Sequence, residues 1–562
     1  MEMKNNINIK MVVGLMTGIF LFACSEDLLI ENPPHLITAD KLFNNLDGFE
    51  NGLNGIYSNI RNEKSGLTSS VDLTLGLLIN GTDLFVSNTP DNNKGASSLM
   101  SQWTTLNDPS YFMYENVFRW LYEIINSANT IINRANENDV NWVGQGNEPD
   151  ENKNRVIAEA KAMRAWAYRH LTYMFGDVPL SLEESVGSNI KTDWKRTPVT
   201  EVRQQIVADL LFAQNYIPVE GSLPGRITRG AVQTYLSEMY LTLNNPDSAL
   251  YWADQVINNS AYQLITSRYG VTSNEGGVPF MDMFLDGNAN REEGNTESLW
   301  TWNFEYNTIG GGQAMLRRVL MSRYMSIQVD GVLPFQITVD RGGRPQSWIG
   351  MTKFAMDLYE IQDDRYSDYA IKKHMVFKTA EQNAPQAADI LPPGYNYGDT
   401  LHFDWSEDIS TTRFGVHDWP WSRKIEGTDP NNPAQTYQYN DIVYMRLAET
   451  YLLKAEAQFL LGLVDEAAET INVIRSRSNA TPITATDMDI DFILDERGRE
   501  LLVEEHRRYT LLRTGKWLER VQAHNQNGGQ RVTSRDRLFP IPQAVIDANL
   551  TSIMSQNEGY SE

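Results

Sequence analysis

Two polar stretches of the chain place tryptophan beside side chains that form hydrogen bonds. The first stretch contains Asp83, Asn88, Trp103 and Asn107, and the second contains Tyr306, Arg344 and Trp348. An aromatic ring offers an apolar face for a sugar, and amide, carboxylate and guanidinium groups can bond to its hydroxyls. These groupings are suited to carbohydrate binding, although neither matches a fixed sequence signature.

The sequence gives little support for catalysis or metal binding. The seven histidines are scattered, and neither an HExxH sequence nor a GxxxxGK[ST] phosphate loop occurs. Carboxylate pairs such as Glu183-Glu184 could suggest a glycosidase, but adjacent residues of a helix or strand point in different directions. The stretch from Asp286 faintly resembles a calcium loop with Glu297 at its twelfth position, yet Arg291 stands where the loop needs glycine. We predict a protein that is not an enzyme and has no cofactor or metal.

The single cysteine, Cys24, ends an N-terminal apolar run that follows Lys4 and Lys10. The run, Met11–Ala23, is too short for the ~30 Å membrane core, which needs about 20 residues, and is typical of a signal peptide. Leu21-Phe22-Ala23-Cys24 resembles a bacterial lipobox, in which cleavage precedes an acylated cysteine. We therefore predict a signal peptide over residues 1–23 and lipid attachment at Cys24, which would anchor the protein without a transmembrane helix.

The amino-acid composition argues against several classes of protein. The 562 residues include 48 Lys and Arg against 72 Asp and Glu, a net charge of −24. Nucleic-acid binding requires a surplus of positive charge, so this balance argues against it. A hydrophobic fraction of 41% with 21% charged residues is typical of a globular protein rather than a disordered or multi-span membrane protein.

Helical periodicity dominates both ends of the chain. Apolar residues recur at three- and four-residue spacing after Phe43, and further helices are predicted over residues 114–135, 156–175, 199–216, 491–505 and 509–520. On these stripes and on the later helix near residue 517, we expect four tryptophans to pack in the core: Trp120, Trp166, Trp252 and Trp517. Trp300 and Trp302 share one face of a predicted strand over residues 297–304, and we expect both to be buried.

One helix–turn–helix pattern occurs twice. Residues 230–243 and 247–258 flank a turn at Asn244, and residues 447–461 and 465–477 flank a turn at Gly462. Ala249 and Ala467 each follow their turn by five residues, and small side chains there let paired helices approach closely, as in tetratricopeptide hairpins. Between the two pairs, residues 266–440 are rich in Gly, Pro, Asn, Asp and aromatics, which predicts an irregular segment with one short helix over residues 352–361.

The order of several motifs resembles the SusD/RagB family of surface glycan-binding lipoproteins of Bacteroidetes. The matching segments are residues 159–165, 175–180, 228–240, 421–424, 446–457, 496–508 and 538–542. The resemblance implies a mainly α-helical protein, in which tetratricopeptide-like hairpins form a scaffold around an irregular, loop-rich insertion with a few short strands. We accordingly divide the mature chain, residues 24–562, into a helical part to 265, the insertion over 266–440 and a second helical part from 441.

The resemblance also implies a function. It predicts a lipoprotein of the outer membrane that faces the cell exterior and passes glycan to a SusC-type TonB-dependent transporter. Acidic residues after Cys24 are similar to the surface-export signal of such bacteria. In the family, the loop between the first long helices contributes to the sugar platform. The predicted glycan contacts are therefore Asp83, Asn88, Trp103, Asn107, Tyr306, Arg344 and Trp348, whereas His506 is expected to form ordinary ion pairs within a structural helix. Peptide uptake and, less favoured, glycoside hydrolysis stay open as alternatives.

Overall fold

The computed structural model describes residues 39–66, 78–87, 103, 107–137, 139–187, 189–409, 417–429 and 431–560. Cys24, the signal peptide and Asn88 lie outside the described residues. No helix within the described ranges combines the length and apolarity that a bilayer span requires.

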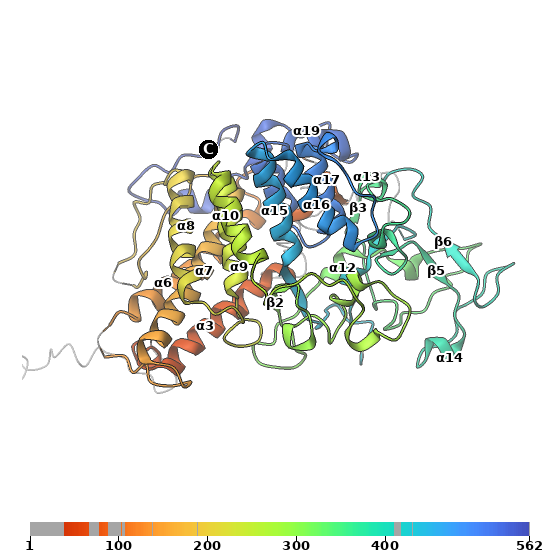
Figure 1. Ribbon diagram of the computed structural model, residues 1–562, viewed down its shortest axis with the longest axis horizontal. Coiled ribbons are helices and arrows are strands. Elements are labelled where there is room, and N and C mark those ends of the chain that lie inside the picture. Colours follow the sequence, from red (N-terminus) through yellow and green to blue (C-terminus); the bar gives the residue numbers. More distant parts are fainter. Residues whose placement is uncertain are drawn as a thin grey trace, which may run out of the picture.

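Long helices form one side of the molecule, and an irregular segment forms the other (Figure 1). The long helices lie where the sequence predicted them, although α7 begins at Pro149 rather than at residue 156: α3 (Leu46–Ile60), α6 (Phe112–Arg134), α7 (Pro149–Phe175), α8 (Val199–Tyr216), α9 (Arg229–Thr242), α10 (Pro246–Ile257), α15 (Leu447–Leu460) and α16 (Val464–Arg477). Shorter helices complete the fold: α2 (Ala39–Leu42), α11 (Pro279–Asp282), α12 (Leu316–Leu320), α13 (Lys353–Asp357), α14 (Ala380–Asn383), α17 (Ile490–Glu500), α18 (Arg507–Arg513), α19 (Trp517–His524) and α20 (Gln543–Asp547). The helix predicted over residues 352–361 is therefore only five residues long, over Lys353–Asp357.

Consecutive helices pack against one another, and the two ends of the chain meet in one scaffold. From α6 to α10 each helix packs on the next, and α10 packs directly on α15, which pairs with α16. Asn244 and Gly462, the two turn residues, adopt left-handed φ angles of 57° and 78°. Ala249 and Ala467 are both fully buried. The predicted hairpins and the role of their small residues are confirmed, because a larger side chain at either alanine would force the helices apart.

The strands are short and pair in twos. In the described part of the chain, β1 (Phe85–Ser87) pairs with β3 (Ile349–Met351), and β4 (Ile371–Lys372) pairs with β7 (Trp421–Ser422). The strand β5 (His374–Val376) pairs with β6 (Thr400–His402), and β2 (Ser298–Trp302) pairs with β8 (Ile442–Arg446). All four pairs are antiparallel. The β2–β8 ladder confirms the predicted strand and ties the start of the insertion to the C-terminal helices.

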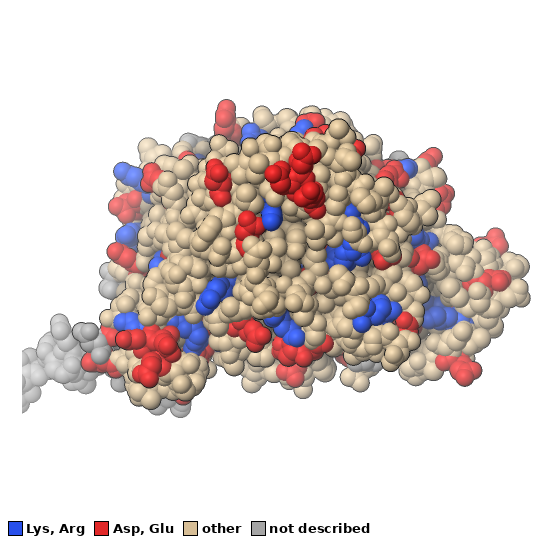
Figure 2. Space-filling view, viewed as in Figure 1, with Lys and Arg blue, Asp and Glu red and all other residues tan. Residues whose placement is uncertain are grey.

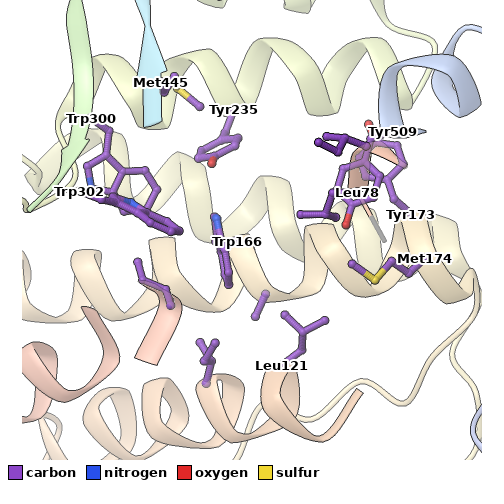
Figure 3. Close-up of a cluster of buried hydrophobic side chains, with 14 of the residues drawn as sticks. Leu78, Leu121, Trp166, Tyr173, Met174, Tyr235, Trp300, Trp302, Met445 and Tyr509 are labelled. Carbon is purple, nitrogen blue, oxygen red and sulfur yellow. The ribbon is translucent and has the colours of Figure 1, made fainter. Parts of the chain in front are cut away.

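Aromatic side chains from distant segments meet in the core (Figure 3). The Trp166 ring of α7 packs edge-on against Trp120 of α6 at 5.6 Å, and the Trp302 ring stacks on Tyr444 of β8 at 3.9 Å. Trp300 and Trp517 are also buried. The predicted core positions are confirmed, except that Trp252 is only partly buried.

Buried ion pairs connect the insertion to the C-terminal helices. Arg446 bonds to Glu297 at 2.8 Å and to Glu500 at 2.5 Å, and Lys424 bonds to Glu504 at 2.6 Å. Several of these residues belong to the motifs that carry the family resemblance. Those motifs therefore specify the fold rather than a ligand, since a buried charge is tolerated only with its partner in place.

The helix expected to continue to residue 505 ends at Glu500, and Val503 adopts a left-handed φ of 66°. His506 consequently lies just before α18 rather than inside a helix. The Nε2 atom of His506 lies 3.0 Å from a Glu63 oxygen, within hydrogen-bond distance, while burial lowers the pKa of the imidazole. The second predicted helix, over residues 509–520, is broken between α18 and α19, where Gly515 has a φ of 73°.

Candidate functional site

The first predicted group of glycan contacts lies in the core. Asp83 is fully buried and forms ion pairs with Arg507 at 2.7 Å and Arg520 at 2.8 Å. Burial opposes ionisation of Asp83, but Arg507 and Arg520 outweigh it and hold the pKa of this carboxyl far below its usual range. Asn107 is buried too and donates a hydrogen bond of 3.2 Å to Asp536. The prediction of direct ligand contact is wrong for both residues, because their polar atoms are already used within the protein.

Trp103 is also a core residue. Its side chain is only 4% exposed and packs edge-on against Trp517 of α19, with ring centroids 5.2 Å apart. The guanidinium of Arg508 lies 5.6 Å from the same ring. The predicted stacking platform is therefore wrong for Trp103, since its faces pack against protein groups.

The second predicted group is split by the structure. Tyr306 is 56% exposed and Arg344 is exposed, so both can meet a ligand. Trp348 is 7% exposed, and the Arg318 guanidinium lies 5.7 Å from its ring. Trp348 thus supports a cation–π contact rather than an open sugar platform.

The exposed Tyr306 forms an aromatic pair with Tyr439, which is half-buried. The two rings meet edge-on, with centroids 5.0 Å apart and planes at 69°. Tyr306 lies on a loop that is closed by a hydrogen bond of 2.9 Å from the Glu305 amide to the Gly311 carbonyl. Tyr439 lies just before β8 and comes from a distant part of the chain. Among the three predicted aromatic contacts, only Tyr306 is exposed.

A polar cavity of about 670 Å³ opens beside this loop. The C-terminal end of α3 and the following 3-10 helix η2 (Arg61–Lys64) form one side of it. Residues 312 and 313 and the Tyr437 side chain form the other side. Its lining contains Ser58, Asn59, Asn62, Ser65 and Gln313. Hydroxyl and amide groups can donate and accept hydrogen bonds, which suits a ligand rich in hydroxyls.

Arg61 connects the cavity to the tyrosine loop. Its guanidinium donates a hydrogen bond to the Gly310 carbonyl and lies 5.8 Å from the Phe304 ring. Burial lowers the pKa of Arg61, and Asp441 partly opposes that effect. Asp441 itself accepts hydrogen bonds from Asn290 and Asn303, so its carboxylate holds the β2 end of the site in place.

The arrangement is suited to binding. It offers Tyr437, the Arg61 guanidinium and several uncharged polar groups around one opening, with Tyr306 on the adjoining loop. Sequence reasoning found Tyr306 but missed Tyr439, Tyr437 and Arg61. Asn59 and Asn62 lie at the end of a helix, and their spacing in the sequence does not mark them as ligand contacts. Only the folded chain brings them to the same cavity as Tyr437.

The loop that faintly resembled a calcium site has other roles. Asn288 is buried and donates a hydrogen bond of 3.0 Å to the Asp282 carbonyl. Glu297 forms ion pairs with Arg446 at 2.8 Å and Arg477 at 3.0 Å. These bonds tie the Asn288 and Glu297 side chains to protein groups.

Two family models match the chain. One, described as the SusD family, matches residues 296–560, and the other, described as starch-binding associating with outer membrane, matches residues 76–241. Together the matched ranges contain the tyrosine loop, β8 and most of the helical scaffold.

Similar proteins extend over the whole chain. SusD-like protein P2 of Formosa agariphila is 24% identical and aligns with 98% of this chain and 99% of its own length. A laminarin binding SusD-like protein of known structure has a TM-score of 0.64 at 22% identity and covers 92% of this chain and 99% of its own. Surface glycan-binding protein A from Bacteroides fluxus has a TM-score of 0.64 at 20% identity, with the same coverage of 92% and 99%. At this identity, the structural likeness establishes the fold.

Proposed function

Because this chain belongs to the SusD/RagB family, we propose that it binds oligosaccharides at the Tyr306–Tyr439 pair and the adjoining polar cavity. The observation that carries the proposal is the exposed Tyr306 ring, paired with Tyr439, on a loop beside an opening lined by amides and hydroxyls. Sugar rings have apolar faces and polar edges, so both surfaces are required for tight binding. The names of the similar proteins, which refer to laminarin and surface glycans, support this ligand class.

The test is calorimetry and affinity electrophoresis of the mature protein against a broad panel of glycans, with a peptide pool as a separate arm. We expect at least one glycan to bind. Tyr306→Ala removes one ring face, and we expect a loss of about 1–2 kcal/mol, or roughly 5- to 30-fold in affinity.

Tyr251→Ala is the matched control for this variant. Tyr251 is 55% exposed and also pairs edge-on with an aromatic neighbour, Trp252, but it lies on the scaffold helix α10. We expect the Tyr251→Ala variant to bind the glycan with the same affinity as the unmodified protein. Binding of peptides with no binding of any glycan would favour the peptide-uptake alternative, and equal effects of the two tyrosine variants would place the ligand elsewhere.

We also propose that the protein is anchored to the outer membrane through lipid on Cys24, faces the cell exterior, and delivers its ligand to a SusC-type TonB-dependent transporter. The lipobox-like N-terminus and the family membership support this assignment. Cys24→Ser should abolish incorporation of labelled fatty acid and release the protein from membranes. Retention of label in this variant would contradict the proposal, as would failure of the lipidated protein to co-purify with any outer-membrane transporter.

A further inference from the structure

Three arginines beside the candidate site have no acidic partner. Arg318, Arg323 and Arg344 form neither an ion pair nor a hydrogen bond through their side chains to any residue the structure describes. Buried arginines elsewhere in the described chain are held by carboxylates, as Arg365 by Glu496 at 2.7 Å, or by backbone carbonyls, as Arg508 by the Asp536 carbonyl at 2.6 Å. We call Arg318, Arg323 and Arg344 the arginine cluster; the first two are half-buried and the third is exposed.

The fold holds the arginine cluster together around α12. Arg318 lies on this helix, and the segment that carries Arg344 runs alongside it, since the Gln346 amide donates to the Arg318 carbonyl at 2.8 Å. The Trp348 ring lies 5.7 Å from the Arg318 guanidinium and supports it from one side. Arg323 follows α12, where Ser322 donates a hydrogen bond to the Trp419 carbonyl and brings residues 417–419 close.

Several nitrogens in this region are shielded from solvent without a partner. They are Nε and Nη1 of Arg318, Nε of Arg323, Nδ1 of His417 and Nε1 of Trp348. A buried donor without an acceptor costs free energy, typically about 1–3 kcal/mol. An acceptor that enters the cluster would recover this energy, so the cluster is prepared for a ligand that accepts hydrogen bonds.

The charges within the cluster repel one another. Burial lowers the pKa of Arg318, and the neighbouring charges of Arg344 and Arg323 lower it further, opposed by Tyr437. Burial also lowers the pKa of His417, as does Arg323, while Asp418 opposes the shift. A negatively charged group placed among these side chains would relieve the repulsion.

Tyr437 links the cluster to the candidate site. It lines the polar cavity, and its carbonyl accepts a hydrogen bond of 3.1 Å from Arg317, the residue next to Arg318. Tyr439, which pairs with Tyr306, is two residues further along. The polar cavity and the arginine cluster therefore share Tyr437 as a neighbour.

We propose that Arg318, Arg323 and Arg344 bind the sulfate or carboxylate groups of an anionic polysaccharide whose sugar rings rest on Tyr306 and Tyr439. Guanidinium groups bind such oxyanions with paired, charge-assisted hydrogen bonds. The net charge of −24 by itself would repel an anionic ligand. Figure 2, however, shows acidic and basic side chains in small separate groups, so a local group of arginines can still attract an anion. The inference rests on the proposed glycan-binding function and specifies the class of glycan.

The test compares pairs of polysaccharides that differ only in charge: a sulfated glycan with its desulfated form, and a uronate glycan with its carboxyl-reduced form. Calorimetry uses the mature protein, Arg318→Gln, Arg344→Gln and the control Arg537→Gln. Arg537 is exposed and lines a separate cavity that also includes Tyr173 and Leu512. All three variants change the net charge equally.

We expect one charged member to bind and its neutral counterpart to bind about 10- to 100-fold more weakly, the value of a charge-assisted hydrogen bond. A difference between the sulfated glycan and its desulfated form would identify sulfate as the bound group. A difference between the uronate glycan and its carboxyl-reduced form would identify carboxylate. Arg318→Gln and Arg344→Gln should lose similar affinity for the charged member only, and Arg537→Gln should lose none. Raising the salt concentration should weaken binding of the charged member alone.

Equal binding of charged and neutral members would overturn the inference and leave the proposed function intact. Equal losses in Arg318→Gln and Arg537→Gln would likewise overturn it, because the anion would then not contact the cluster. No binding of any glycan by the folded protein would instead refute the proposed function.

Discussion

Asp83 provides the sharpest test of the difference between a ligand contact and a buried ion pair. Its carboxylate bonds to Arg507 through both oxygens, at 2.9 and 2.7 Å, and accepts a further bond of 2.8 Å from Arg520. We consider Asp83→Asn, which keeps the size of the side chain and removes its charge. The change leaves two arginines facing an uncharged group.

The expected loss of stability depends on the ion pairs that Arg507 and Arg520 keep in this variant. Breaking a buried ion pair typically costs 3–5 kcal/mol, because the remaining charge is buried without compensation. Arg507 keeps Glu505 at 3.2 Å, and Arg520 keeps Asp491 at 2.9 Å and Asp495 at 2.5 Å. These contacts compensate part of the loss, so we expect Asp83→Asn to lower the free energy of unfolding by about 3 kcal/mol.

The assay is urea unfolding, followed by glycan affinity of the folded variant. Asp47→Asn is the control, since Asp47 is an exposed residue of α3, and its loss should stay within about 0.5 kcal/mol. Asp83→Asn should bind glycan as well as the unmodified protein. Unchanged stability together with lost binding would refute the reasoning and restore Asp83 as a ligand contact.

Further predictions concern acid stability, helix packing and turn geometry. Burial opposes ionisation of Glu505, but Arg497 and Arg507 lower its pKa to about 2, from 4.5. The folded state therefore binds fewer protons, so this stabilisation is complete above pH 4.5 and is lost as the pH falls to 2; it amounts to roughly 3 kcal/mol. Acid titration of unfolding should show a shallower decline in Glu505→Gln, and an unchanged decline would contradict the assignment. Ala249→Leu should lower the free energy of unfolding in urea by about 1–3 kcal/mol, because α9 and α10 leave no space for the larger side chain. A neutral effect would show that these two helices are not closely packed. Gly462→Ala should cost about 1 kcal/mol, because its φ of 78° is unfavourable for alanine although no atom would contact the new Cβ. A stabilising effect, measured by the same unfolding, would show that this turn does not hold a left-handed φ.

The helical scaffold could be predicted because its signals are local. The apolar spacing that predicted α8 gave its bounds from Val199 to Tyr216, and the turns at Asn244 and Gly462 followed from residues that tolerate a left-handed φ. The break at Gly515 and the early end of α17 were missed. The turn after Glu500 requires a left-handed φ at Val503, which a β-branched residue does not suggest.

The sequence by itself determined the helices, the paired turns, the core tryptophans on periodic stripes and the family to which the chain belongs. Only the tertiary structure decided which polar and aromatic residues face a ligand. Trp103 and Tyr306 both lie in irregular segments, where spacing does not indicate a face. One packs on Trp517 and the other pairs with Tyr439 at the surface. The physical reason is that burial in such segments depends on distant partners, as Asp83 depends on Arg507, and local periodicity carries no information about them.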